Sequence, residues 1–329
     1  ADVIKEHSEI KDGEHTGVNV SIRGRILNAR SFGKLLFYDL LDQSGKIQLL
    51  INSGEIDELY LKLFDNFDIG DIIAVNGEII KTKKGELSIK VNETTILSKS
   101  LRTLPEKWHG LKDKETRFRQ RYLDLIVNPE SKKILQTRSN VVRLLREYLH
   151  ANEFIEVETP ILQSKAGGAI AKPFLTHHNA LNLDMYLRIA PELYLKRLVI
   201  GGFEKVFEIG KIFRNEGIDQ THQPEFTMLE SYQAYADMNI VMDMVEDMCE
   251  YVFDNLEINK EIEFNGEQAS FSRPWKRVSM YDLVSEKLGI EVNFNTGFED
   301  LSSKLADQNI DFEAQTVGLL VFELFENFI

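Results

Sequence analysis

The stretch of residues 205–235, KVFEIGKIFRNEGIDQTHQPEFTMLESYQAY, constrains the fold of this chain more than any other. Its first part is rich in strand-forming residues, at Val206, Phe207, Ile209, Ile212 and Phe213. A polar, glycine-containing segment covers residues 215–223, and a second strand-like run begins near Glu225. The pattern predicts an antiparallel hairpin with a long loop.

Alternate side chains of a strand share one face of a sheet, so this hairpin predicts an unusual set of groups on one face. They are Arg214 and Glu216 on the first strand and Phe226, Met228, Glu230 and Tyr232 on the second. Such a set suits a nucleotide plus a small cationic substrate, because a guanidinium binds phosphate and carboxylates bind an ammonium. For an isolated hairpin, the alternative is an exposed sheet face with surface Arg–Glu pairs.

The hairpin also resembles a known motif. The string FRNE at residues 213–216, the segment from His222 to Phe226, and Glu230 resemble the second signature motif of class II aminoacyl-tRNA synthetases. The longer pattern FRNEGIDQTH, PEFTM and AYAD is similar to that of the lysyl enzymes. The resemblance implies a lysine-tRNA ligase, which converts L-lysine and ATP to lysyl-adenylate and pyrophosphate and then transfers lysine to tRNA(Lys). Positioning and charge stabilisation would lower the barrier, without a protein nucleophile.

The resemblance also implies roles for individual residues. Arg214 is the expected catalytic residue, between the α-phosphate and the lysine carboxylate. The other expected ATP-binding residues are Asn215, Glu216 at the adenine amino group, His222 towards the outer phosphates, Gln223, and Phe226 stacked on adenine. The expected lysine-binding residues are Gly168, Glu192 at the α-ammonium, and Glu230 with Tyr232 at the ε-ammonium. Gln223 occupies a position where the lysyl family usually has Asn, and this difference bears on a single expected contact of the loop.

Gly168 and Glu192 can also be interpreted without the resemblance. The pair Gly167-Gly168 permits close backbone approach to a ligand. Pro191 fits the first turn of a helix, and Glu192 then lies at its positive end. Without the resemblance, a simple helix-start carboxylate is the better interpretation of Glu192. His177 and His178 have no other ligand at metal spacing nearby, and we read them as loop or surface residues.

The region from Val18 to Lys99 has an all-β pattern with one helical break. Five strand-like runs are separated by glycines, and residues 56–67 read as a short helix between the third and fourth runs. This layout predicts an OB-fold barrel, which often binds single-stranded nucleic acid. Phe37 could stack on a base or belong to the barrel core, and the sequence alone leaves the two readings even. The resemblance to lysyl enzymes implies that Arg30, Phe37, Gln48 and Glu86 bind the anticodon.

A helix followed by a strand ending in proline comes after the barrel. The helix is predicted from about Ser131 to Ala151, and Phe154 to Pro160 follow it. This arrangement resembles the first class II motif, which implies a homodimer; helix–strand packing within one subunit is the alternative. The family usually has Gly before the phenylalanine, and Glu153 here predicts an ordinary backbone conformation.

These observations predict an α+β chain. We expect an OB-fold anticodon-binding domain at residues 1–104, a linker at 105–130, and a class II catalytic domain of antiparallel sheet flanked by helices at 131–329. The glycine-rich third class II motif is absent, and the helix-like run at 315–329 stops without a cap. We therefore expect an incomplete catalytic domain with weak or no aminoacylation by itself, no metal ligands among these residues, and the Mg²⁺ ligands in a missing C-terminal part.

Composition limits the other classes of function. A net charge of −14 argues against a protein that coats nucleic acid non-specifically. The single cysteine fits a reducing compartment, and no apolar run reaches bilayer length, so a soluble cytoplasmic protein is expected. Two alternatives stay open: a non-catalytic RNA-binding or regulatory relative, and an aspartyl- or asparaginyl-tRNA synthetase. The latter need a cationic side-chain pocket, whereas Glu230 and Tyr232 predict an anionic one.

Overall fold

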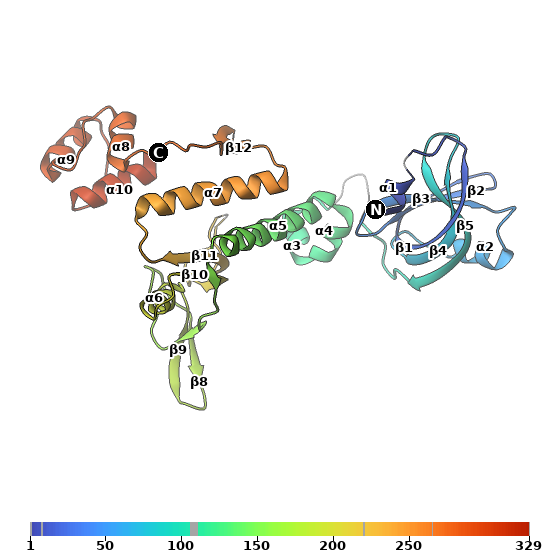
Figure 1. The fold of residues 1–329 in the computed structure, drawn as a ribbon, viewed down its shortest axis with the longest axis horizontal. Helices are drawn as coiled ribbons and strands as arrows, with labels where there is room; N and C mark the ends of the chain where they lie inside the picture. The colour runs from blue at the N-terminus through green and yellow to red at the C-terminus, as the bar shows by residue number, and fades with distance from the viewer. Residues whose placement is uncertain (1, 8, 106–110, 220, 265, 329) are drawn as a thin grey trace. The chain divides into compact units, whose positions relative to one another are not determined.

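A computed structural model describes residues 2–7, 9–105, 111–219, 221–264 and 266–328 (Figure 1). The chain divides into two compact units, Ala1–Gln136 and Thr137–Ile329. The domain boundaries expected at 104 and 130 remain predictions, and residues 106–110 of the expected linker lie outside the described residues.

The first unit contains a closed five-stranded barrel with strand order β1-β2-β3-β5-β4. Its elements are α1 (Asp2–Glu6), β1 (His15–Phe32), β2 (Leu35–Leu41), β3 (Lys46–Asn52), α2 (Glu58–Phe64), β4 (Ile72–Lys81) and β5 (Leu87–Ser98). The pair β3–β5 is parallel and the other neighbours are antiparallel. Helix α2 lies between β3 and β4 in sequence, so the predicted OB-fold is confirmed.

Strand β2 shows how alternation builds the barrel. Tyr38 and Leu40 are buried in the barrel core, and Leu36 packs against it. Phe37 and Asp39 therefore project from the outer face. The interpretation of Phe37 as a core residue is wrong, because the core is filled by its neighbours on either side.

Three helices follow the barrel: α3 (Lys114–Arg119), α4 (Arg121–Val127) and α5 (Pro129–Ala151). The buried carboxylate of Asp124 accepts hydrogen bonds from Asn128 Nδ2 at 2.6 Å and Arg117 Nε at 2.8 Å. The bond from Asn128 is the largest cause that lowers the pKa of Asp124 to about 2. Arg117 also donates to Ser131 at 3.0 Å, so this cluster joins α3 and α4 to the start of α5.

The second unit contains several small sheets. One has the order β11-β10-β6 and another the order β7-β9-β8, while β12 and β13 form a hairpin. The strands are β6 (Ile155–Glu156), β7 (Leu162–Gln163), β8 (Leu175–His178), β9 (Leu183–Leu187), β10 (Lys205–Phe213), β11 (Glu225–Gln233), β12 (Glu261–Phe264) and β13 (Glu267–Ser270). The helices are α6 (Glu192–Ile200), α7 (Met238–Leu256), α8 (Met280–Leu288), α9 (Phe298–Asp307) and α10 (Val317–Phe328).

Helices α5 and α7 cover one face of the β10–β11 hairpin (Figure 1). Phe207 and Leu229 on that face pack with Tyr148 of α5 and Met244 of α7. Glu208 and Glu230 lie opposite each other in the register, on the other face. The predicted hairpin is thus confirmed, with one correction: β10 ends at Phe213, so Arg214 and Glu216 lie beyond the strand.

The backbone before Phe154 differs from the prediction. Glu153 adopts a φ of 68°, in the left-handed region that favours glycine. The expectation of an ordinary conformation is therefore wrong. The turn between α5 and β6 imposes this left-handed conformation. In that turn the backbone nitrogen of Glu153 donates to the His150 carbonyl and that of Phe154 to the Leu149 carbonyl, both at 3.0 Å.

A buried ion pair lies on the face of the hairpin opposite helices α5 and α7. Arg188, directly after β9, and Glu208 of β10 are both nearly inaccessible to solvent and form an ion pair. The Arg188 Nε also donates to the carbonyl of Lys211 at 2.9 Å, and the Glu208 carboxylate accepts from the Thr159 hydroxyl at 2.6 Å. Gly210 leaves the space for the guanidinium, because a β-carbon there would lie 2.1 Å from Arg188 Nη2.

We therefore expect Gly210→Ala to destabilise the second unit by about 2–4 kcal/mol, since Arg188 must leave its buried partner. Gly318→Ala is the matched control, because a β-carbon there meets nothing within 4 Å and the residue lies in a helix. Urea unfolding of both variants measures the difference. Equal stability of the two variants would contradict the packing role of Gly210.

Candidate functional site

Arg214 lies at the open end of the β10–β11 hairpin, beside an aromatic ring. Its guanidinium carbon is 5.3 Å from the centroid of Phe226, and its backbone nitrogen donates to the Pro224 carbonyl at 2.9 Å. The Nε also donates to the carbonyl of Ile189 at 3.4 Å. The stacked ring and these bonds fix the direction of a planar cation that suits a phosphate or carboxylate.

A pocket of about 530 Å³ opens beside Arg214. It is lined by Arg214, Glu216, Gly217, Ile218, Asp219, Thr221, His222, Gln223 and Phe226. All the predicted nucleotide-binding residues except Asn215 therefore line one pocket. Asn215 is not among the lining residues, and its backbone nitrogen donates to the Lys172 carbonyl at 2.7 Å. The Glu216 carboxylate accepts from the backbone nitrogen of Lys172 at 3.3 Å.

Asp219 organises the loop of this pocket, and the sequence reasoning missed it. Its carboxylate accepts from the backbone nitrogens of Thr221 and His222, both at 2.7 Å, and lies 2.8 Å from His222 Nδ1. The bond to the His222 side chain is the largest cause that holds the pKa of Asp219 far below its usual range. An aspartate two residues before a threonine is a signal for such a turn.

The predicted ammonium-binding residues also lie together. The Tyr232 hydroxyl donates to Glu230 at 3.1 Å, and both project from the face of β11 opposite helices α5 and α7. Gly168 has a φ of 90°, and a β-carbon there would lie 3.0 Å from Cβ of Glu192. The backbone at Gly168 approaches Glu192 so closely, and with such a φ, that only glycine fits this position without strain.

The surroundings of Glu230 raise the pKa of its carboxyl group. Burial, and then the negative charges of Glu192 and Glu208, raise its pKa, while the Tyr232 hydroxyl and Arg214 act in the opposite direction. Burial and the charge of Glu230 raise the pKa of Tyr232 as well. Across the described residues, no ion pair joins Glu230 to a cation. A bound ammonium would supply the missing positive charge.

The predicted anticodon residues occupy the outer face of the barrel. Arg30 of β1 is paired in register with Phe37 of β2, and Gln48 of β3 accepts from the Ser88 hydroxyl at 3.0 Å. Glu86 directly precedes β5, and its backbone nitrogen donates to the Thr82 hydroxyl at 3.0 Å. The sequence reasoning missed Asp39, which lies 3.2 Å from Arg30 and faces Gln48 in the register. Arg30, Phe37, Asp39 and Gln48 form one polar and aromatic band across β1, β2 and β3, and Glu86 lies outside these strands.

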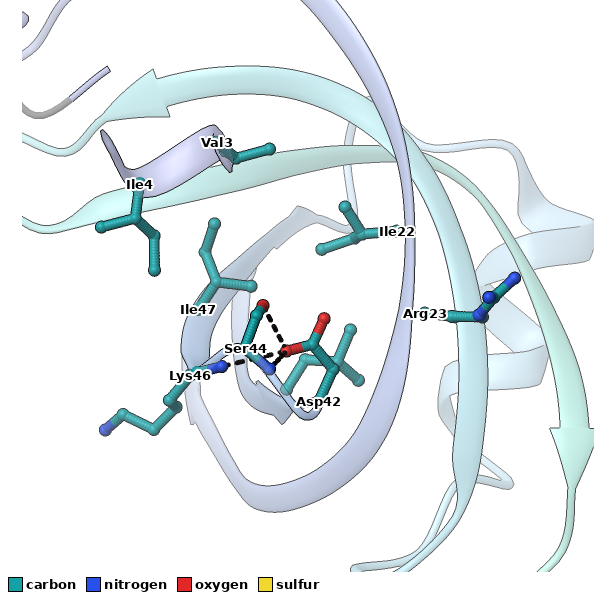
Figure 2. Close-up of a pocket in the computed structure, with 10 residues that line it drawn as sticks. Val3, Ile4, Ile22, Arg23, Asp42, Ser44, Lys46 and Ile47 are labelled. Atoms are coloured by element: carbon teal, nitrogen blue, oxygen red, sulfur yellow. Dashed lines mark hydrogen bonds between the residues drawn. The ribbon is translucent and has the colours of Figure 1, made fainter. Parts of the chain in front are cut away.

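Figure 2 shows a second, much smaller pocket of about 50 Å³ at the barrel. Val3 and Ile4 of α1 lie across from Ile22 and Ile47. Asp42 is engaged within its own turn, because its carboxylate accepts from Ser44. Apolar side chains and a few polar ones line this pocket, which is only of the size of a packing gap.

The remaining candidates carry no site. His177 lies 2.7 Å from Asp184 across the exposed β8–β9 hairpin. Within the described ranges, no group of three or more His, Cys, Asp or Glu side chains could hold a metal ion. None of the helices described there is both long and apolar enough to cross a membrane.

Comparison with known proteins identifies both parts of the chain. Residues 113–317 match the family described as tRNA synthetases class II (D, K and N), and residues 20–97 match the OB-fold nucleic acid binding domain. The chain is 47% identical to a lysine–tRNA ligase of Clostridium botulinum (strain Hall) over 331 residues, 99% of this chain and 64% of that protein. It is 48% identical to a lysine–tRNA ligase of Syntrophomonas wolfei over 317 residues, 96% of this chain and 64% of that protein. The chain thus spans less than two thirds of the length of these curated relatives.

The raised pKa of Glu230 generates a prediction about stability. A carboxyl whose pKa is higher in the folded state destabilises that state wherever it is ionised, and has no such effect below its unfolded pKa. We expect Glu230→Gln to raise the free energy of unfolding at pH 7, and this advantage to disappear as the pH falls below about 4.5. Denaturant unfolding between pH 4 and 8 tests it, with the exposed Glu225→Gln as control. A Gln variant less stable at pH 7 would contradict the assignment.

Proposed function

This chain belongs to the class II tRNA synthetases of the D, K and N group, and on that basis we propose that it activates L-lysine with ATP for transfer to tRNA(Lys). The observation that carries the proposal is the division of one sheet face into two ends. Arg214 and Phe226 form a cationic and aromatic end, while Glu230, Tyr232 and Glu192 form an anionic one. ATP and a dicationic amino acid have the complementary charges.

The pocket at the cationic end suits ATP. Phe226 stacks on adenine and Glu216 accepts a hydrogen bond from its amino group. Arg214 binds the α-phosphate, while His222 and Gln223 lie towards the outer phosphates. The support is that all these side chains line one pocket beside a fixed guanidinium. Asn215 completes the assigned set through its place directly after Arg214.

The anionic end suits lysine. Glu230 and Tyr232 receive the ε-ammonium, Glu192 receives the α-ammonium, and Gly168 lets the amino acid approach the backbone. An acidic or amide side chain would meet carboxylates instead of a cation, so the arrangement disfavours aspartate and asparagine. A site built around a buried charge discriminates strongly, because the wrong ligand leaves that charge unpaired.

The chemistry then depends on positioning. The lysine carboxylate attacks the α-phosphorus, a new C–O–P linkage forms, and the bond to pyrophosphate breaks. Arg214 holds both reacting groups and stabilises the charge that develops on the phosphate oxygens. The family resemblance implies Mg²⁺ as well. Because the described residues offer no cluster that fits it, the proposal assigns the ion no ligand and no step.

The barrel is the proposed tRNA-binding part. Phe37 stacks on an anticodon base, Gln48 hydrogen-bonds a base edge, and Arg30 and Glu86 lie alongside. The support is the band that Arg30, Phe37 and Gln48 form on the outer barrel face, since unpaired bases are commonly read by stacking and edge contacts. Glu86 is assigned from the family resemblance alone. We further propose a homodimer through α5 and β6, on the resemblance to the first motif, and a cytoplasmic location, which the single cysteine fits.

Amino-acid-dependent ATP–pyrophosphate exchange tests the central proposal. The natural gene product that carries this sequence should exchange with L-lysine and not with L-aspartate or L-asparagine. The anionic end of the site is the physical reason. Exchange with none of the three amino acids would favour a non-catalytic RNA-binding role, and exchange with aspartate would contradict the reading of Glu230.

Substituting Arg214→Ala in the same protein should reduce lysine-dependent exchange by about 10²- to 10³-fold or more, as removal of a charge-stabilising donor does. Arg119→Ala is the control, because this arginine is exposed and, in the described part of the chain, forms an ion pair only with Glu115 on its own helix. Unchanged turnover in Arg214→Ala would refute its assigned role.

Substituting Phe37→Ala should weaken tRNA(Lys) charging while lysine-dependent exchange stays unchanged. Loss of one stacked base costs about 1–3 kcal/mol, which predicts a rise in the KM for tRNA of roughly five- to 150-fold. Leu59→Ala, an exposed apolar residue of α2, is the control. Equal loss of charging and exchange would contradict the anticodon assignment.

A further inference from the structure

Lys196 lies one helical turn after Glu192 on α6 and holds its carboxylate. The Nζ of Lys196 donates to Oε1 of Glu192 at 2.5 Å. The Glu192 side chain is 27% exposed and that of Lys196 is 53% exposed. Glutamate followed by lysine four residues later is also a common surface pair of helices, usually worth little. The surroundings of this pair decide whether it does more.

The two oxygens of Glu192 face different neighbours. While Oε1 bonds Lys196, Oε2 is 3.6 Å from the position that a β-carbon on Gly168 would occupy. The Glu192 side chain therefore runs along the glycine backbone, with one oxygen held by the lysine and the other turned to the Gly168 side. That second oxygen is the acceptor that an α-ammonium would meet.

The ammonium of Lys196 also reaches the sheet. It lies 5.8 Å from the ring centroid of Tyr232 on β11, whose hydroxyl donates to Glu230. An ordinary helix-surface pair touches only its own helix, whereas this cation connects α6 to the strand that carries the ε-ammonium residues. It also lies near a cluster in which the charge of Glu192 contributes to the raised pKa of Glu230.

We infer that Lys196 is a positioning residue for the α-ammonium subsite: it holds one oxygen of Glu192 so that the other is directed at the substrate. This inference rests on the proposed function and deepens it. A carboxylate whose rotamer is already fixed loses less conformational freedom on binding, and its charge-assisted bond to the ammonium is correspondingly stronger. Lys196 is not itself expected to contact the reacting atoms.

The test uses the natural gene product with Lys196→Met and Lys196→Arg, assayed by lysine-dependent ATP–pyrophosphate exchange. Inhibition by 6-aminohexanoate is measured in parallel, because this compound keeps the ω-ammonium and the carboxylate of lysine but lacks the α-ammonium. The matched control is Lys62→Met, which removes a lysine from another i,i+4 pair, with Glu58 on α2.

Lys196→Met should raise the KM for lysine about five- to tenfold, with kcat and the KM for ATP little changed. The inhibition constant of 6-aminohexanoate should stay the same, and Lys196→Arg should restore most of the affinity for lysine. Lys62→Met should match the parent protein. This combination of results distinguishes a role at the α-ammonium from a general effect on the fold, which would weaken the binding of both ligands.

Three results would overturn the inference. The first is an unchanged KM for lysine in Lys196→Met. The second is a lower KM, which would show that Lys196 competes with the substrate ammonium for Glu192. The third is an equal loss of affinity for lysine and for 6-aminohexanoate. A parent protein without lysine-dependent exchange would overturn the proposed function and this inference with it. An active parent with an unaffected Lys196→Met would overturn this inference alone.

Discussion

The buried ion pair between Arg188 and Glu208 is the interaction on which the rest of the site depends. Burying two charges is costly unless both are paired and hydrogen-bonded, and here Thr159 and the Lys211 carbonyl complete the set. The pair joins the segment after β6, the end of β9 and strand β10. Because helices α5 and α7 cover the opposite face of the hairpin, this pair fixes the face that remains for ligands.

The two glutamates on this face differ in how their charges are compensated. Glu208 has its guanidinium partner, but Glu230, its cross-strand neighbour, depends on a tyrosine hydroxyl and has a raised pKa. Among the described residues Glu230 has no ion-pair partner, although the charge of Arg214 acts on it, and a bound ammonium would supply a closer positive charge. Arg214, at the open end of the hairpin, is placed to bind an anion. A substrate with an ammonium at one end and a carboxylate that meets ATP at the other fits that order.

Much of this arrangement could be predicted from the sequence, because two-residue alternation determines which side chains share a strand face. Alternation placed Phe226, Glu230 and Tyr232 together, and it also defined the barrel strands. The pair Arg188–Glu208 could not be predicted, since its partners lie on different strands and meet only through the three-dimensional register and the space left by Gly210. Lys196 has the spacing of a surface pair, and only the neighbouring Tyr232 ring distinguishes it. At Glu153 the turn geometry overrides the residue's own preference.

The central claim is that this sheet face selects an amino acid by its cationic side chain, through the carboxylate of Glu230, which has no ion-pair partner among the described residues. Calorimetric titration of the protein with L-lysine and with L-norleucine, whose side chain is apolar and of similar length, tests it most directly. The account predicts that lysine binds at least about a hundredfold more tightly, because norleucine leaves the half-buried Glu230 without a counter-charge. Equal affinity for the two amino acids would contradict it.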